Sequence, residues 1–245
     1  MKTFLVDLMF GVGLVVIVVI SLSILSHQRK TLGVSTDNIE TNLKVVALTF
    51  DDGPSEHTQQ ILSILKEKNV QATFFVVGEN IEHYPELVQD AYFQGHQIGN
   101  HSQSHPVMYF MNQSDILHEF AQTEEQIYEL IGVRPAILRI PYGWYHQLNM
   151  WKMLETNYYQ IIGWNVDPED WKKPSPDRIV QNVIETVQPG SIILMHDGPP
   201  LSDRAATIEA LPDMIDALYQ KGYQFVTVGK LQELNQDHIM LKGKI

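Results

Sequence analysis

Residues 45–54 read VVALTFDDGP, an apolar, β-prone run that stops at two aspartates, a glycine and a proline. A short apolar run bounded by turn residues is typical of a buried strand. The titratable residues lie where this strand gives way to a loop. In parallel α/β barrels, active sites are built at that end of the strands. The segment therefore predicts both the fold class and the place where the chemistry occurs.

Strand-like runs alternate with amphipathic helical patterns along the rest of the chain. We expect strands at Val45–Phe50, Thr73–Val77, Gln97–Gly99, Ile137–Ile140, Gln160–Val166, Ser191–Met195 and Gln224–Val228. We expect helices at His57–Lys68, Pro85–Gln94, Ser114–Ile131, Leu148–Thr156, Pro176–Val187 and Ala205–Lys221, with Ser114 as an N-cap. This alternation predicts a mainly parallel sheet with helices outside it, either an incomplete barrel or an open sheet.

Four more polar clusters follow predicted strands. They are His101–Pro106, Arg139–Gly143, Asp167–Trp171 and Leu194–Asp197. A single aspartate or histidine in such a place is usually a loop residue or a helix cap. Five successive clusters at the carboxyl ends of strands instead predict that their side chains meet in one site.

Asp52, His101 and His105 are candidate metal ligands. Two imidazoles and a carboxylate suit Zn²⁺ or a similar divalent ion, and three protein ligands leave positions open, as catalytic sites do. A His-x-x-x-His pair alone is often a surface feature. The acidic pair at the end of another strand strengthens the metal interpretation, but Co²⁺, Ni²⁺ and Mn²⁺ fit these ligands as well.

Asp51 is the candidate general base. Side chains alternate along a regular strand, so Asp51 and Asp52 can both face the site only if the Gly53-Pro54 turn bends the chain. Arg139 is the candidate that keeps Asp51 ionised and oriented. A surface salt bridge is the alternative role for Arg139, although its place on an apolar strand argues against that.

His196 is the candidate general acid, because an imidazole can donate a proton near neutral pH. A histidine after the apolar run Ile192–Met195 is usually a satisfied core residue. Asp197 behind it and the Asp170-Trp171 pair favour a catalytic role instead. Asp170 is placed to hydrogen-bond the second ring nitrogen of His196. Trp171 would supply an apolar wall of the site; a core tryptophan is the alternative, and the two roles are compatible.

The amino terminus differs from the rest of the chain. Residues 8–25 carry no charge and are apolar apart from two glycines and two serines. We expect residues 1–27 to be a signal-anchor that crosses the lipid bilayer once, residues 28–43 a polar linker, and residues 44–245 the catalytic domain. A cleaved secretory signal is the alternative, but no small-x-small site follows the apolar run.

The composition argues against a nucleic-acid partner and against any chemistry that needs cysteine. The formal net charge of −12 argues against a nucleic-acid partner. The chain has no cysteine, which excludes disulfides and thiolate metal ligands.

The five clusters together resemble the motifs of the polysaccharide deacetylases, also called carbohydrate esterase family 4 or the NodB homology domain. The motifs stand in family order as Thr-Phe-Asp-Asp-Gly-Pro, His-Ser-x-x-His-Pro, Arg-x-Pro-Tyr-Gly, Asp-x-x-Asp-Trp and Leu-x-His. The resemblance covers Val45 to Leu231. It implies a distorted (β/α)7-type barrel that hydrolyses the N-acetyl groups of N-acetylglucosamine units in a glycan and releases acetate.

The resemblance also implies residue roles. Asp51 would be the base and His196 the acid, with Asp52, His101 and His105 on the metal. Arg139 would position the base, Asp170 would tune His196, and the backbone amide of Tyr142 would help hold the oxyanion. The roles of the other residues agree with those argued from the residue types above, whereas the role of Tyr142 rests on the resemblance alone.

The substrate and the location are less constrained. A domain anchored outside a membrane meets cell-wall glycan first, so we expect peptidoglycan, although chitooligosaccharides fit the motifs equally well. A cleaved amino terminus would make the protein secreted. The alternatives are a tethered glycan-binding protein with little turnover and a hydrolase of a non-sugar amide.

Overall fold

The structure is a computed structural model that describes residues 43–143, 154, 160–198 and 203–242, with side chains up to residue 235. These residues all belong to one unit, Ser35–Ile245. The predicted membrane segment at 1–27, nearly all of the predicted linker, and the predicted helix Leu148–Thr156 apart from Leu154 lie outside the described residues. Among the described helices, none is long and apolar enough to cross a bilayer.

Strand β1 (Val45–Asp51) is the centre of the sheet, and all of its residues are buried. It pairs in parallel with β2 (Thr73–Val76) on one side and with β6 (Ile192–His196) on the other. The short strand β7 (Gln224–Phe225) pairs in parallel with its first residues. An uninterrupted apolar strand suits this position because neighbours and helices cover it on both faces.

The sheet continues from β2 through β3 (Gln97–Asn100), β4 (Ile137–Leu138) and β5 (Gln160–Ile161). Every pairing is parallel. An isolated parallel bridge between Val166 and Ile193 brings the chain after β5 beside β6. The prediction of a mainly parallel α/β sheet is therefore confirmed.

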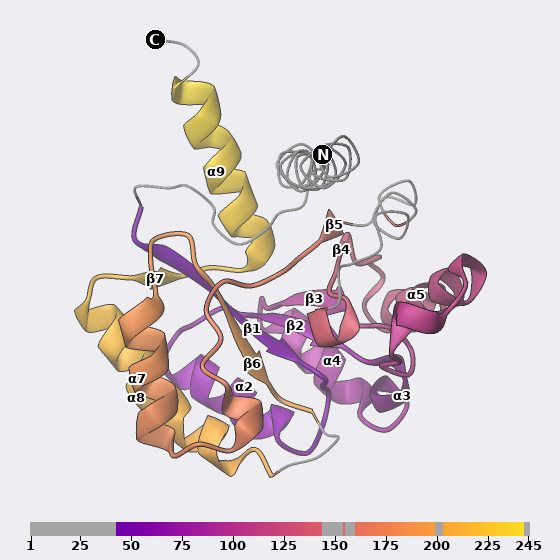
Figure 1. The fold of residues 1–245 in the computed structure, drawn as a ribbon, viewed down its shortest axis with the longest axis horizontal. Coiled ribbons are helices and arrows are strands. Elements are labelled where there is room, and N and C mark those ends of the chain that lie inside the picture. Colours follow the sequence, from indigo (N-terminus) through magenta and orange to yellow (C-terminus); the bar gives the residue numbers. More distant parts are fainter. Residues whose placement is uncertain (1–42, 144–153, 155–159, 199–202, 243–245) are drawn as a thin grey trace, which may run out of the picture. The chain divides into compact units, whose positions relative to one another are not determined.

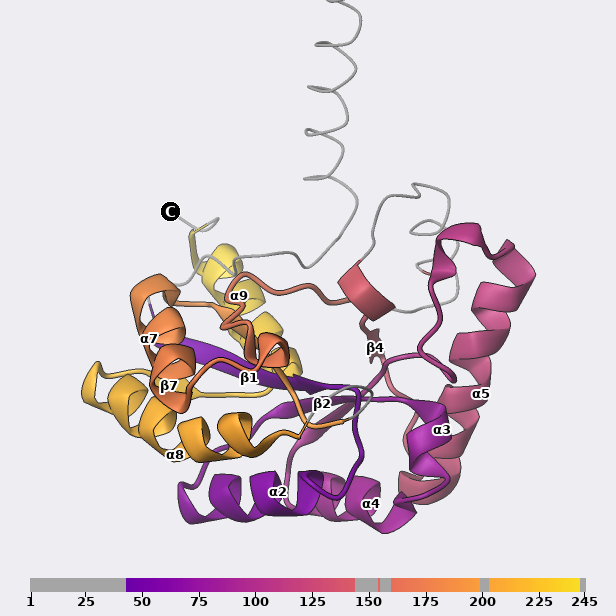
Figure 2. The same ribbon diagram turned by 60° about the horizontal axis from the view of Figure 1, so that its bottom comes forward.

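Helices flank the sheet (Figures 1 and 2). The α-helices are α2 (Thr58–Glu67), α3 (Gly78–Ile81), α4 (Pro85–Phe93), α5 (Gln113–Ile131), α7 (Pro176–Thr186), α8 (Ala205–Gln220) and α9 (Val228–Lys242). The 3₁₀ turns in the described part of the chain are η1 (Met108–Phe110), η2 (Pro141–Gly143) and η3 (Asp170–Lys172). Figure 2 shows α2, α4 and α8 on one face of the sheet and α9 on the other.

The two faces of β1 have different surroundings. Val46, Leu48 and Phe50 join the larger core cluster, which includes residues of α2, α4, α7 and α8. Val45 and Ala47 join a smaller cluster with residues of α9. Because side chains alternate along a strand, Thr49 and Asp51 share this second face. The second face therefore changes from apolar to polar toward the carboxyl end of β1.

Strand β2 is one residue shorter than predicted, and three other strands are shorter by two residues or more. Strand β4 ends at Leu138 because Pro141 cannot donate to a ladder and begins the turn η2. Strand β5 ends at Ile161, and the carbonyl of Gly163 accepts a hydrogen bond from Arg139 instead. Strand β7 ends at Phe225, and the amide of Val228 donates to Thr73 Oγ1 at the start of α9, a helix that the sequence did not predict.

The predicted N-cap of the long helix α5 was wrong by two residues. The side chain of Asn112, not that of Ser114, accepts a hydrogen bond from the backbone amide of Asp115 at 2.9 Å. Ser114 is an exposed residue inside the first turn. At the other end, Gly132 adopts φ 72°, the left-handed conformation in which glycine often ends a helix.

We expect Asn112→Ala to lower the free energy of unfolding by about 1 kcal/mol, because one helix amide then loses its acceptor. Ser114→Ala is the matched control and should change stability by less than about 0.5 kcal/mol. Chemical denaturation of both variants measures the difference. A larger loss for Ser114→Ala than for Asn112→Ala would show that the cap is assigned to the wrong residue.

Candidate active site

The loop after β1 turns both aspartates toward the same side. Asp51 ends the strand, and Asp52 leaves it with φ 71°, a left-handed conformation that interrupts the alternation of side chains. The conformation of Asp52 itself, in addition to the predicted Gly53-Pro54 turn, therefore allows both carboxylates to face the site. Both aspartates are buried, with 4% and 7% of their surface exposed.

Asp52, His101 and His105 come together as predicted. Asp52 Oδ1 lies 3.5 Å from His101 Nε2 and 3.2 Å from His105 Nε2. One ligand atom from each residue lies within 4.8 Å of the others. One carboxylate oxygen and two imidazole nitrogens at this spacing fit a divalent cation such as Zn²⁺. Among the described residues this is the one group of three or more such side chains with that geometry.

Different hydrogen bonds hold His101 and the loop that carries His105. His101 Nδ1 lies 2.8 Å from the carbonyl oxygen of Arg139, so Nδ1 carries the proton and Nε2 is left as the ligand atom. His105 sits in a loop held by Glu119 of α5, whose carboxylate accepts from the backbone amides of Gln103 and Ser104. This anchoring from α5 explains how both imidazoles converge from a short loop.

Burial and neighbouring charges favour the deprotonated form, which can bind a metal, at two of the three residues, Asp52 and His105. Burial alone would raise the pKa of Asp52, but the hydrogen bond and charge of His101 hold it below its usual value. Burial and the charge of His101 lower the pKa of His105. Burial would lower the pKa of His101 too, yet the charges of Asp51 and Asp52 raise it, so a cation must displace a proton there.

Arg139 is the most deeply buried charge of the site, with no exposed surface. Its Nη1 donates to Asp51 Oδ1 at 2.7 Å and to Thr49 Oγ1 at 2.8 Å. Its Nη2 and Nε donate to the carbonyls of Gly163 at 2.9 Å and Ile162 at 3.3 Å. The surface salt bridge considered for Arg139 is therefore excluded.

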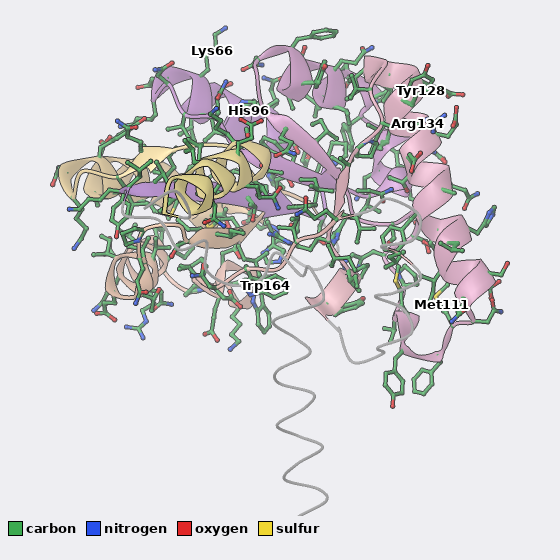
Figure 3. The ribbon with its side chains drawn as sticks, turned by 90° about the horizontal axis from the view of Figure 1, so that it is seen from above. Lys66, His96, Met111, Tyr128, Arg134 and Trp164 are labelled. Atoms are coloured by element: carbon green, nitrogen blue, oxygen red, sulfur yellow. The ribbon has the colours of Figure 1, made fainter. Side chains whose placement is uncertain are left out.

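Two aromatic rings complete the surroundings of this guanidinium. Its Cζ lies 4.2 Å from the ring centroid of Phe75 and 5.5 Å from that of Trp164, which is labelled in Figure 3. Cation–π contacts of this kind lower the cost of burying the charge.

His196 is paired with Asp170 in the predicted manner. Its Nδ1 lies 2.7 Å from Asp170 Oδ1, and its backbone amide donates to Asp170 Oδ2 at 3.0 Å. Thr207 Oγ1 also donates to Asp170 Oδ2, at 2.9 Å. Burial lowers the pKa of His196, but the hydrogen bond and charge of Asp170 outweigh it and raise that pKa to about 9. His196 is therefore a cation at neutral pH.

The sheet register brings the two ends of the site together. Asp51 on β1 is the direct partner of His196 on β6. An anionic carboxylate held by Arg139 and a cationic imidazole held by Asp170 thus stand side by side on neighbouring strands. Their protonation states are opposite, as a base and an acid require.

Tyr142 and Trp171 lie at the surface of the site region. Tyr142 has φ 61°, is 52% exposed, and its ring centroid lies 4.6 Å from that of His105. Trp171 is 48% exposed and its side chain hydrogen-bonds Asp167, so it is not a core tryptophan. Another histidine near a strand, His96 (Figure 3), is structural: its Nδ1 accepts from the amide of Ala72, and burial lowers its pKa to about 4.

Sequence reasoning missed the polar layer behind Asp52. Asp197 is buried and accepts from Thr58 Oγ1 at 2.6 Å, and burial raises its pKa to about 7. Arg204 is 3% exposed, donates twice to the carbonyl of Gly198, and brings its Nη2 to 3.7 Å from Asp52 Oδ2. A lone arginine at the start of a helix carries no sequence signal for such a contact.

We expect the imidazole of His196 to titrate near pH 9 and to shift well below that in Asp170→Asn, because burial then acts without the opposing carboxylate. The folded pKa lies above the unfolded value of about 6.5. The charged pair therefore stabilises the fold fully below pH 6.5, and this contribution is lost as the pH rises through 9. It amounts to up to about 3 kcal/mol.

NMR titration of chelator-treated protein measures the His196 pKa directly, and chemical denaturation at pH 6 and pH 10 measures the stability term. Glu169→Gln is the matched control, because Glu169 neighbours Asp170 but pairs with Lys172 at the surface. An unchanged His196 titration in Asp170→Asn would refute the assigned cause.

Comparisons with known proteins place the chain in one family. A model of the polysaccharide deacetylase family matches residues 38–161. A peptidoglycan-N-acetylglucosamine deacetylase of Bacillus cereus is 40% identical over 197 residues, which are 80% of this chain and 71% of the relative. A peptidoglycan-N-acetylmuramic acid deacetylase of Bacillus subtilis is 35% identical over 201 residues, which are 82% of this chain and 41% of that longer protein.

The fold leads to the same family. The crystal structure of a peptidoglycan N-acetylglucosamine deacetylase in complex with a naphthyl-substituted N-hydroxybenzamide matches with a TM-score of 0.77. The match has 40% sequence identity and covers 80% of this chain and 91% of the other. With its family match, its relatives and its fold in agreement, this chain belongs to the polysaccharide deacetylase family.

Proposed function

We propose that this protein hydrolyses the N-acetyl groups of N-acetylglucosamine units in a cell-wall polysaccharide and releases acetate. One observation carries the proposal. The triad of Asp52, His101 and His105 stands with a buried carboxylate, Asp51, and a half-buried imidazolium, His196, which are register partners on adjacent strands. A base, an acid and a cation site in this arrangement are the requirements for hydrolysing an unactivated amide.

Asp52, His101 and His105 would hold the divalent metal, for which Zn²⁺ is our first choice and Co²⁺, Ni²⁺ and Mn²⁺ are alternatives. When bound, such an ion supplies a Lewis acid that polarises the amide carbonyl and makes water a better nucleophile. The donor set supports this assignment, since the described residues bring one carboxylate and two imidazoles together at the spacing of metal ligands.

Asp51 would act as the general base. Arg139 occupies its Oδ1, whereas Oδ2 lies 3.6 Å from His101 Nε2 and faces the triad. Oδ2 is therefore the oxygen available to take a proton from the attacking water. Arg139 fixes the orientation of the carboxylate through its hydrogen bond to Oδ1.

His196 would act as the general acid. An amine anion is too basic to leave, so the sugar nitrogen must receive a proton as the carbon–nitrogen bond breaks. His196 carries that proton at neutral pH because Asp170 raises its pKa to about 9. Asp170 also fixes Nδ1 as the donor to itself, which leaves Nε2 to serve the substrate.

Tyr142 and Trp171 would complete the substrate site. The backbone amide of Tyr142 would donate to the oxyanion. Tyr142 has a left-handed conformation, so the backbone of the η2 turn does not continue the course of a strand. Trp171 would provide an exposed apolar wall against which the sugar packs.

Peptidoglycan is the favoured substrate. Support comes from the named activities of the relatives in Bacillus cereus and Bacillus subtilis. Chitooligosaccharides remain the alternative that the motifs allow. We further propose a distorted (β/α)7-type barrel anchored by residues 8–25 as a single membrane span, with the catalytic domain outside the cell; a cleaved amino terminus would release it as a secreted enzyme.

We expect Asp51→Asn and His196→Ala each to lower the turnover number by about 10²–10⁴-fold with the fold intact, because each removes one proton-transfer group. Acetate release from N-acetylated glycan measures the effect. Asp90→Asn and His83→Ala are the matched controls, since both residues are exposed and distant in sequence from the five clusters. Near-wild-type turnover in either active-site variant would contradict the assigned role.

We expect chelator-treated protein to lose activity and to regain it on addition of Zn²⁺. Mass spectrometry should then show the loss of acetyl groups from purified peptidoglycan fragments, with chitooligosaccharides tested in parallel. Preference for chitooligosaccharides would replace the favoured substrate, whereas full activity in metal-free protein would refute the metal-dependent scheme.

A further inference from the structure

We propose that Arg204 is a positioning residue for the metal ligand Asp52. It holds one carboxylate oxygen of Asp52 so that the other stays directed at His101 and His105. This inference deepens the proposed function, since it concerns the same metal site, but it assigns a role to a residue outside the five motifs.

The two oxygens of Asp52 have separate surroundings. Oδ1 lies 3.2 and 3.5 Å from the Nε2 atoms of His105 and His101, and Oδ2 lies 3.7 Å from Arg204 Nη2. A carboxylate with both oxygens free can rotate about its last bond and lose the direction of its ligand atom. A cation next to Oδ2 disfavours that rotation, and neighbours of this kind typically tune metal ligands.

Arg204 is itself held in place. Its Nε and Nη2 both donate to the carbonyl of Gly198, at 2.9 and 2.8 Å, which fixes the plane of the guanidinium. Gly198 in turn lies against the backbone of Asp52, since a Cβ at Gly198 would come within 1.8 Å of the Asp52 carbonyl oxygen. The side chain therefore ties the loop after His196 to the loop that carries Asp52.

The burial of Arg204 needs a reason beyond fold stability. Only 3% of it is exposed, and its Nη1 has no hydrogen-bond partner among the residues that the structure describes. Its placement follows a pattern of cations paired with carboxylates: Arg139 lies against Asp51, His196 lies against Asp170, and Arg204 lies against Asp52, on the oxygen that does not face the histidines.

Two opposite effects on metal affinity allow a sharp test. A positive charge near the site repels a cation, so its removal by itself would tighten metal binding. A positioning role predicts the reverse, because the ligand atom loses its direction. Loss of comparable neighbours of metal ligands weakens affinity by roughly 10–100-fold.

The experiment uses the full chain, stripped with a chelator, and measures the dissociation constants of Zn²⁺ and Co²⁺ by competition with a chromophoric chelator. We expect Arg204→Met to weaken both by roughly 10–100-fold. Arg204→Lys keeps the charge but loses the two-pronged contact with Gly198, so its affinity should lie between wild type and Arg204→Met.

Two control variants separate positioning from general effects. Arg178→Met makes the same replacement on the exposed side of α7. Leu218→Ala removes a fully buried side chain from α8, the helix that Arg204 precedes, and so lowers stability. Both should keep wild-type metal affinity, and circular dichroism should confirm that each variant is folded.

The outcomes are distinguishable. Unchanged or tighter metal binding in both Arg204 variants, or equal weakening in Leu218→Ala, would overturn the inference and leave the proposed function standing. Wild-type protein that binds neither ion would overturn both. If Arg204→Met fails to fold, Arg204→Lys alone decides, with weakened affinity supporting the role and wild-type affinity refuting it.

Discussion

The buried ion pair between Asp51 and Arg139 is the interaction on which the rest of the site depends. The guanidinium has no exposed surface, and its donors reach Asp51 and Thr49 on β1 and the carbonyls of Ile162 and Gly163 after β5. It therefore joins the centre of the sheet to its far edge through one side chain. Removal of one partner from such a pair costs about 3–5 kcal/mol, since the other charge stays buried. The pair therefore stabilises the fold and fixes the orientation of the Asp51 carboxylate.

Pairing also sets the opposite charge states of the two proton-transfer groups. Asp51 is anionic beside a permanent cation, and His196 is cationic beside Asp170. The charge of His196 does not follow from residue type alone, because burial without a partner would lower its pKa. The parallel register then places Asp51 directly opposite His196. Strand pairing supplies the distance between acid and base, and the two ion pairs supply their protonation.

The predictable part of the molecule is the part with local signals. The central strands, most helices and the meeting of Asp52, His101 and His105 followed from apolar runs that end in polar residues. The misplaced N-cap shows the limit, because Asn112 and Ser114 are both good caps and only the backbone decides between them. Arg204 shows a deeper limit. Its contact with Asp52 joins segments far apart in the chain, and no periodicity or spacing marks it.

The site also depends on its surroundings for the backbone conformation of its loops. Asp52, Ser102, His105 and Tyr142 all adopt left-handed conformations, with φ between 52° and 71°. Such a conformation costs a non-glycine residue about 1–3 kcal/mol and persists only where surrounding contacts hold the residue in place. Asn80 Nδ2 donates to the carbonyl of Asp52, the amide of His105 donates to Ser102 Oγ, and Glu119 accepts from two amides of the histidine loop. Polar side chains around the site therefore help to hold these loops in the conformations that bring the metal ligands together.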